Sequence, residues 1–180
     1  VADAYIKAGM YKKVLVIGAE VMSQVVDWKD RSVCVLFGDG AGAVVLGEDI
    51  SGKSIFRLHS DSGSAQALTL GKENAVHMNG REIFSFAVRK VPESLKEVLE
   101  ESETAKEQVK YFILHQANVR IIESVAKRLG IDMNRFPVNL SRYGNTSSAS
   151  IPILLDELNR ENKLQNEDLL VFAGFGAGLN

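Results

Sequence analysis

Cysteine is almost absent from this chain, and long hydrophobic runs are absent altogether. The 180 residues include one cysteine, so no disulfide can close within the chain, and this favours a reducing compartment. No apolar run approaches the roughly 20 residues that cross a bilayer. No cationic start followed by an apolar stretch indicates a signal peptide. We therefore expect a cytoplasmic protein with no membrane partner.

An excess of one charge is also missing. Lysine and arginine number 21 and the acids 23, giving a net charge of -2, so nothing global favours nucleic acid as a partner, and any basic patch must be local. The chain is 46% hydrophobic and 24% charged, as in one globular domain with a sizeable core. Since no linker or tandem repeat divides it, we expect a single domain over residues 1–180.

The hydrophobic pattern predicts an α/β fold. Residues 14–17 (VLVI) form an unbroken apolar run, typical of a strand covered on both faces. Apolar residues at three- and four-residue spacing predict a long amphipathic helix over residues 83–99, which Pro92 could bend. Further strands are expected at 33–37, 43–46, 55–59, 111–114 and 169–172, and further helices at 1–7, 119–129 and 149–161.

Three polar or glycine-rich patterns stand at the ends of apolar elements, where α/β proteins build their sites. They are residues 115–118 (HQAN), 143–147 (YGNTS) and 174–178 (GFGAG). Each has a plainer interpretation: a histidine at a strand end can cap the next helix, an Asn in such a turn can be a turn former, and glycines often serve tight turns.

Taken together and in order, these patterns resemble the second half of ketoacyl-acyl-carrier-protein synthase III, among the thiolase-like condensing enzymes. The resemblance also rests on residues 1–5 (VADAY), 37–43 (FGDGAGA), 58–63 (LHSDSG, with one inserted serine) and 79–84 (NGREIF). It implies an α-β-α-β-α layered fold of two similar halves, each with a five-stranded mixed sheet, of which this chain is the later half.

The family resemblance also implies an activity, the start of fatty-acid synthesis by decarboxylative condensation of an acyl-CoA with a malonyl-acyl-carrier protein. A cysteine of the family's first half is acylated, and that residue would precede Val1, so we expect the amino-terminal half as a separate or missing chain, and a homodimer of the complete enzyme. A polyketide-priming or acyl-transferring relative and a non-catalytic CoA-binding scaffold remain alternatives.

By the same resemblance, His115 and Asn145 are the remaining catalytic pair. Decarboxylation leaves an enolate, and two fixed N–H donors, a neutral imidazole and a carboxamide, suit its oxygen. A second oxyanion hole, for acyl transfer, would use the cysteine amide and a backbone amide around Ala177.

The resemblance assigns Arg31, Gly80, Phe84 and Asn118 to the CoA channel. The alternatives are a solvated Arg31, a turn at Gly80, a core position for Phe84 and a helix cap at Asn118. Three further basic residues, Arg120, Lys127 and Arg128, share a helix region where an acidic carrier protein could dock, although a merely solvated face is the plainer interpretation.

Several tempting features indicate no chemistry. Cys34 is expected inside a buried strand as a small core residue. The glycine-rich run at 38–42 leads into a strand and not into the helix that a phosphate site requires, so we interpret it as a turn. His59 and His77 are not at ligand spacing with other donors, so no metal site and no permanently bound cofactor are expected; a CoA thioester is the expected substrate.

Overall fold

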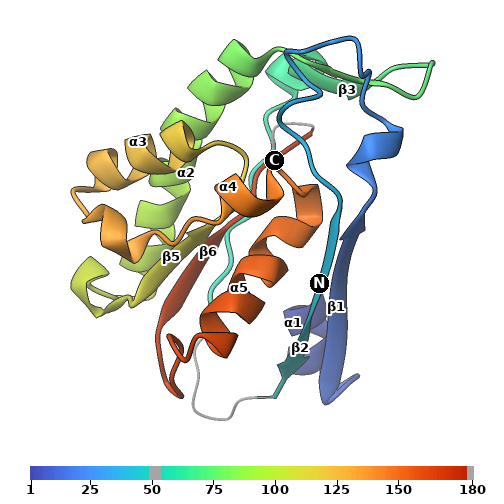
Figure 1. Ribbon diagram of the computed structural model, residues 1–180. Helices are drawn as coiled ribbons and strands as arrows, with labels where there is room; N and C mark the ends of the chain where they lie inside the picture. The colour runs from blue at the N-terminus through green and yellow to red at the C-terminus, as the bar shows by residue number, and fades with distance from the viewer. Residues whose placement is uncertain (49–53, 178–180) are drawn as a thin grey trace.

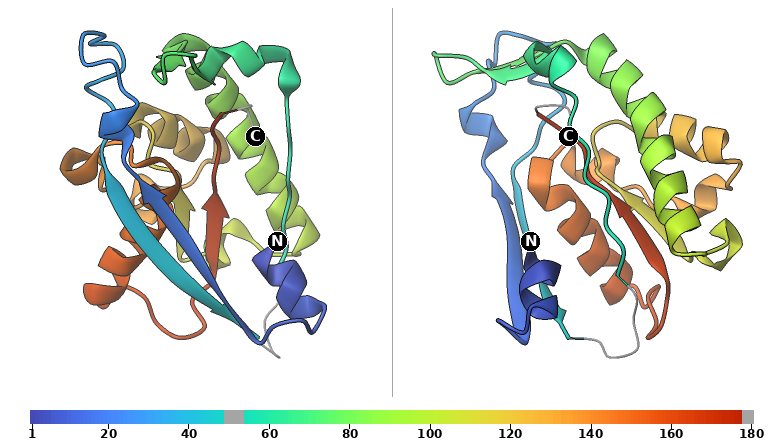
Figure 2. Two further views of the ribbon diagram at one scale, coloured as in Figure 1. Left: turned by 90° about the vertical axis from the view of Figure 1, so that its right-hand side faces the viewer. Right: turned by 180° about the vertical axis from the view of Figure 1, so that it is seen from behind.

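A computed structural model describes residues 1–48 and 54–177. Strands and helices alternate in layers (Figures 1 and 2): an antiparallel pair β1–β2, helix α5, a parallel pair β5–β6, and helices α2 and α3 on the far side. These elements are β1 (Lys13–Glu20), β2 (Gly40–Gly47), α2 (Gly80–Glu101), β5 (Tyr111–Leu114), α3 (Val119–Leu129), α5 (Ser150–Arg160) and β6 (Leu170–Ala173). The α/β class expected from the sequence is confirmed.

Smaller elements connect these layers. They are α1 (Ala2–Lys7), β3 (Leu68–Leu70), β4 (Val76–Met78), α4 (Leu140–Tyr143), and 3-10 turns at Met22–Gln24, Ser62–Ala67, Lys106–Gln108, Met133–Arg135 and Ser147–Ala149. None of the helices among residues 1–48 and 54–177 combines the length and the apolar character that crossing a membrane requires.

The main core lies between the β5–β6 pair and helices α2 and α3. β5 contributes Phe112 and Leu114, both almost fully buried, and Phe112 stacks on Phe136 with ring centroids 5.1 Å apart. Helix α3 presents one apolar face to this core and ends at Gly130, whose φ of 61° is the left-handed conformation that glycine adopts without strain. The predicted boundaries of β5 and α3 are confirmed.

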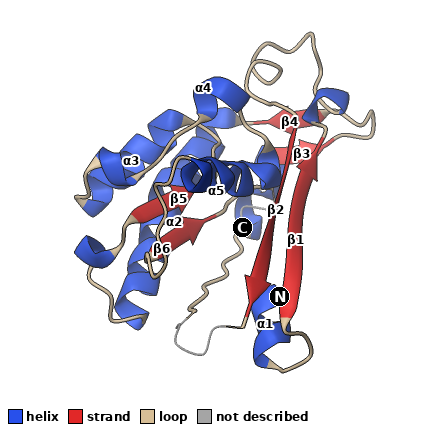
Figure 3. Ribbon diagram, turned by 60° about the horizontal axis from the view of Figure 1, so that its bottom comes forward, coloured by secondary structure: helices blue, strands red, loops and turns tan. Residues whose placement is uncertain are grey.

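The β1–β2 pair packs on α5 through glycine. A Cβ added at Gly42 would lie 2.9 Å from Pro152 Cβ, and one added at Gly18 would lie 2.6 Å from the Ser148 carbonyl oxygen. Figure 3 shows α5 between the two strand pairs. Gly18 in β1 and Gly42 in β2 therefore allow close packing against the α5 region. The run at 38–42 continues into a strand, as expected, but its interpretation as a turn is wrong for residues 40–42, which already belong to β2.

Two expected strands are absent, and with one of them the expected position of Cys34 in a buried strand. Residues 33–36 form turns and Phe37 makes an isolated bridge with Asn145. The turns form because the Asp30 carboxylate accepts the Ser32 amide at 2.8 Å and the Asp30 carbonyl accepts those of Val33 and Cys34. Cys34 therefore lies in a turn and is only partly buried. Residues 55–59 join no strand ladder in the described part of the chain.

The strand at 14–17 is confirmed, but its expected burial on both faces is wrong for this chain. Leu15 is 59% exposed and Ile17 62% exposed, because only the face that carries Gly18 meets the segment before α5. The described strands also form three separate pairs, β1–β2, β3–β4 and β5–β6, so no single sheet of five strands is assembled within residues 1–48 and 54–177.

Candidate active site

His115 lies directly after β5, at the carboxyl edge of the parallel strand pair. Its backbone N–H donates to the Ala173 carbonyl at 2.8 Å, which extends the β5–β6 pairing by one residue. Helix α3 begins four residues later. The strand, histidine and helix order expected from the sequence is therefore present, and His115 is held by the backbone of both strands.

The imidazole of His115 is enclosed and neutral. Its Nδ1 lies 2.7 Å from Ser150 Oγ, and the ring of Phe175 packs edge-on with centroids 5.2 Å apart. Burial lowers the pKa of His115 from 6.5 to about 4, since desolvation disfavours the charged ring. Its Nε2 makes no hydrogen bond within the described residues. At neutral pH the site therefore offers an uncharged imidazole with one unoccupied nitrogen.

Asn145 lies in a turn whose backbone is fixed by the segment before β2. The Asn145 N–H donates to the Leu36 carbonyl at 2.8 Å, and its carbonyl accepts the Gly38 amide at 3.0 Å. Gly144, with φ 67°, precedes it in a conformation that a side chain would strain. The side-chain Oδ1 accepts the Ser147 amide at 2.9 Å. The carboxamide NH₂ is thus the end of Asn145 available to donate outward.

Two hydrogen bonds link the segment around His115 to the chain on either side of Asn145. After Asn145, Ser150 contacts the imidazole. Before it, the fully buried Gln116 accepts the Asn139 amide at 3.2 Å and donates to the Leu114 carbonyl at 2.7 Å. The structure therefore brings the histidine and the asparagine turn into one region, and Ser150 and Gln116, which the sequence analysis did not assign, are the residues that join them.

The segment after β6 borders the same edge. Phe175 packs on His115, and added Cβ atoms at Gly174 and Gly176 would meet nothing within 4 Å, so backbone there is open to a close approach. Ala177 follows at the margin of a neighbouring cavity. Gly178, the last residue of the expected glycine pattern, lies outside the described residues.

Three of the four expected CoA-channel residues have the plainer features that the sequence offered as alternatives. Asn118 caps α3, with Oδ1 accepting the Arg120 amide at 2.9 Å, and Phe84 packs against the main core. Gly80 is the exposed first residue of α2, where a turn was the alternative. The Arg31 guanidinium is exposed and makes no ion pair or hydrogen bond within the described part of the chain.

The basic residues of α3 are all exposed. Arg120, Lys127 and Arg128 project away from the buried face of the helix. The hydrogen bond from Lys90 is the main cause that lowers the pKa of the Glu93 carboxyl on α2, and the charges of Lys90, Arg89 and, least, Arg128 add to it.

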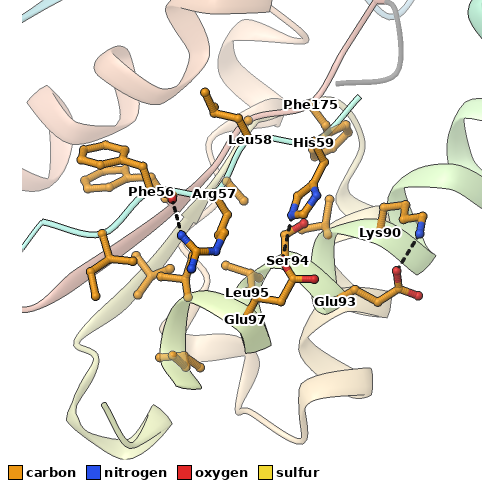
Figure 4. Close-up of a pocket in the computed structure, with 18 of the residues that line it drawn as sticks. Phe56, Arg57, Leu58, His59, Lys90, Glu93, Ser94, Leu95, Glu97 and Phe175 are labelled. Atoms are coloured by element: carbon orange, nitrogen blue, oxygen red, sulfur yellow. Dashed lines mark hydrogen bonds and ion pairs between the residues drawn. The ribbon is translucent and has the colours of Figure 1, made fainter. Parts of the chain in front are cut away.

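A cavity of about 910 Å³ lies beside the site and was not foreseen. It separates residues 54–61 from α2 and β6 (Figure 4), and its wall includes Phe56, Leu58 and Phe175. His59 Nε2 lies 2.8 Å from Glu97 Oε2, and Arg57 pairs with Glu101, so residues 57 and 59 are tied to α2. His115 and Asn145 do not line this cavity.

Metal ligation finds no support in the described ranges. Across residues 1–48 and 54–177, no three His, Cys, Asp or Glu side chains gather as metal ligands would. His77 pairs with Glu73, four residues earlier, and His59 pairs with Glu97.

Comparison with known proteins shows which family this chain resembles. Residues 1–81 match the family model for 3-oxoacyl-[acyl-carrier-protein (ACP)] synthase III, and residues 99–180 match the model for its C-terminal part. A beta-ketoacyl-[acyl-carrier-protein] synthase III of Oceanobacillus iheyensis is 46% identical over 180 residues, covering 99% of this chain and 58% of that protein.

Solved structures agree in fold. The 3-oxoacyl-[acyl-carrier-protein] synthase III of Aquifex aeolicus VF5 superposes with a TM-score of 0.95 at 46% identity, covering 99% of this chain and 58% of the other. A priming beta-ketosynthase from the R1128 polyketide biosynthetic pathway gives a TM-score of 0.90 at 34% identity, covering 99% of this chain and 57% of the other.

This chain therefore spans a little under three fifths of the length of the relatives that it matches. The thiolase-like fold expected from the resemblance is confirmed by these structures. On the agreement of sequence and structure, the chain belongs to the beta-ketoacyl-[acyl-carrier-protein] synthase III family.

Proposed function

We propose that this chain forms the later part of a condensing enzyme that starts fatty-acid synthesis. The substrates are an acyl-CoA starter, acetyl-CoA or a similar thioester, and a malonyl-acyl-carrier protein. The names of the relatives support this assignment, and the environment of His115 supports the chemistry. A neutral, enclosed imidazole beside an asparagine turn is suited to donating hydrogen bonds and unsuited to holding a positive charge.

The reaction places negative charge where these donors lie. Loss of CO₂ from the malonyl thioester leaves its bonding electrons in an enolate, whose oxygen His115 Nε2–H and the Asn145 NH₂ stabilise. The enolate carbon then attacks the acyl thioester on the cysteine, and the thiolate leaves. Donors fixed before the reaction stabilise such charge more than mobile water does, because no reorganisation is needed.

The cysteine belongs to a part of the enzyme outside this chain, since the only cysteine here, Cys34, lies in a turn. We propose that residues 1–180 act as one domain of the complete enzyme, and that the complete enzyme is a homodimer in the cytoplasm. A backbone amide around Ala177 would contribute to the second oxyanion hole.

Substrate delivery uses two further regions in this proposal. Arg31, Gly80, Phe84 and Asn118 line the path of the CoA arm, although Phe84 and Asn118 also serve packing and capping. Arg120, Lys127 and Arg128 form an exposed basic surface on α3 for the acidic carrier protein. Charge reversal at Lys127 should raise the KM for the carrier substrate while leaving the KM for acyl-CoA unchanged.

A chimera tests the catalytic assignment. The matched region of the Oceanobacillus iheyensis relative is replaced by this chain, and decarboxylation of malonyl-carrier protein is measured. His115→Ala and Asn145→Ala should each slow decarboxylation by about 100- to 1,000-fold, since each removes one oxyanion donor. His77→Ala, at an exposed histidine, is the matched control. An active chimera that keeps full decarboxylation without His115 and Asn145 would instead support a non-catalytic CoA-binding scaffold.

The structural likeness to a polyketide-priming ketosynthase favours one alternative substrate range. Competition among radiolabelled acyl-CoA starters on the active chimera distinguishes fatty-acid initiation from polyketide priming. Preference for acetyl-CoA supports fatty-acid initiation, whereas preference for a longer starter supports polyketide priming.

A further inference from the structure

Ser150 is the polar side chain in contact with His115, and it is almost completely enclosed. It is the first residue of α5, its exposed fraction is 2%, and its Oγ lies 2.7 Å from His115 Nδ1. The same oxygen accepts the backbone N–H of Gln116 at 3.3 Å. The hydroxyl therefore meets both the side chain of His115 and the peptide that follows it.

A count of protons and lone pairs sets the direction of the contact with His115. A serine hydroxyl carries one proton and two lone pairs, and the Gln116 amide occupies one lone pair. If the imidazole also donated, the hydroxyl proton would need another acceptor. Within the described residues, Oγ makes no hydrogen bonds besides those to the Gln116 amide and Nδ1. A buried donor without an acceptor is costly, so the hydroxyl donates and Nδ1 accepts.

This direction fixes the position of the imidazole proton. A neutral imidazole carries one proton, so a ring that accepts at Nδ1 must carry it on Nε2. Nε2 is the nitrogen that makes no hydrogen bond in the described part of the chain. The ring thus presents an N–H donor, and not a lone pair, on its unoccupied side.

We propose that Ser150 is a positioning residue, whose buried hydroxyl holds His115 in the Nε2–H tautomer. The catalytic consequence rests on the proposed function, since an Nδ1–H tautomer would turn a lone pair toward the enolate oxygen and repel it. The tautomer itself is a property of this chain and can be measured without any substrate.

Nitrogen NMR on the histidine-labelled chain reads the tautomer directly. The chain holds three histidines, so His59→Gln and His77→Gln assign the ring signals by elimination. At pH 7.5 we expect His115 to show a lone-pair nitrogen at Nδ1 and a protonated nitrogen at Nε2. A protonated Nδ1 in the unsubstituted chain overturns the proposal, whatever the variants do.

Variants isolate the contribution of the hydroxyl. Ser150→Ala should move both ring nitrogens toward the averaged shifts of two exchanging tautomers, while Ser150→Thr, which keeps a hydroxyl, should restore the single form. Ser148→Ala is the matched control, because that serine bonds Glu20 on β1 and not His115. Unchanged His115 shifts in a folded Ser150→Ala chain contradict the proposal.

Kinetics in the chimera separate this inference from the proposed function. Ser150→Ala should lower kcat for malonyl decarboxylation about tenfold, the equivalent of one hydrogen bond, with little change in KM and with recovery in Ser150→Thr. A changed tautomer with unchanged decarboxylation would leave the Ser150 assignment intact and refute the catalytic role of His115.

Discussion

The β5–β6 and β1–β2 strand pairs differ in how much of their surface this chain covers. β5 and β6 lie between α5 and helices α2 and α3 (Figure 2), and Phe112, Ile113 and Leu114 of β5 are almost fully buried, although Phe172 of β6 is 48% exposed. The β1–β2 pair meets α5 on one face only, and Leu15, Ile17 and Val45 are each about three fifths exposed on the other. Equally apolar strand sequences therefore reach different burial, because burial depends on what packs against the second face.

Truncating one large side chain in each strand pair tests this difference in burial. Phe112→Ala should lower the free energy of unfolding by about 3–5 kcal/mol, since it leaves a cavity beside Phe136 in the main core. Ile17→Ala, at a side chain that is 62% exposed, should cost under about 1 kcal/mol. Urea unfolding followed by circular dichroism measures both. Similar losses would show that the outer face of β1 is covered in solution.

A pH series of unfolding measurements tests whether the His115 imidazole, at the end of β5, is shielded from water. The pKa of His115 is about 4 in the folded chain and 6.5 as the ordinary value, so acid protonates the unfolded chain first. The contribution of His115 to the free energy of unfolding is therefore largest above pH 6.5. It decreases between pH 6.5 and pH 4 and is constant below pH 4. The total loss should be about 3 kcal/mol.

His115→Gln is the control for the pH series. Carboxyl groups with lowered pKa values, such as Asp168 beside Lys110, also lose their ion pairs in acid, and they do so in both chains. The difference between the two urea curves therefore isolates the imidazole. Equal pH dependence with and without His115 would mean that water reaches the ring.

The same contrast explains which features could be predicted from the sequence. β5 and α3 were predicted correctly because their packing partners lie within the chain and their apolar patterns are clear. The strand predicted at 33–37 is absent because the Asp30 carboxylate holds the chain in turns there, and the apolar pattern alone does not indicate this local hydrogen bonding. The segment at 55–59 contains three apolar residues but pairs with no strand in the described ranges.

Within the candidate site, the sequence indicated the residues of the resemblance but not those that hold them. His115 and Asn145 occur in recognisable motifs, the first at a strand end and the second in a glycine-containing turn. Ser150 follows two other serines, at 147 and 148, and nothing in that run distinguishes the one that becomes buried against the imidazole. Gln116 was visible in its motif, but its bond to the Asn139 amide joins positions 23 residues apart, which only the folded chain reveals.

Glycine substitutions on β2 test how tightly the inner face of the β1–β2 pair packs on α5, while its outer face is exposed. A Cβ at Gly42 would meet Pro152 Cβ at 2.9 Å and the Ile153 nitrogen at 3.0 Å, so Gly42→Ala must displace α5 and should cost about 1–3 kcal/mol. Gly47→Ala, in the same strand but with nothing within 4 Å, should be neutral or stabilising by up to about 1 kcal/mol, because alanine restricts the unfolded chain. Urea midpoints of the two variants measure the difference. If Gly42→Ala is as harmless as Gly47→Ala, α5 does not lie tightly on β2, and the Ser150 end of that helix would not be held against His115 by this contact.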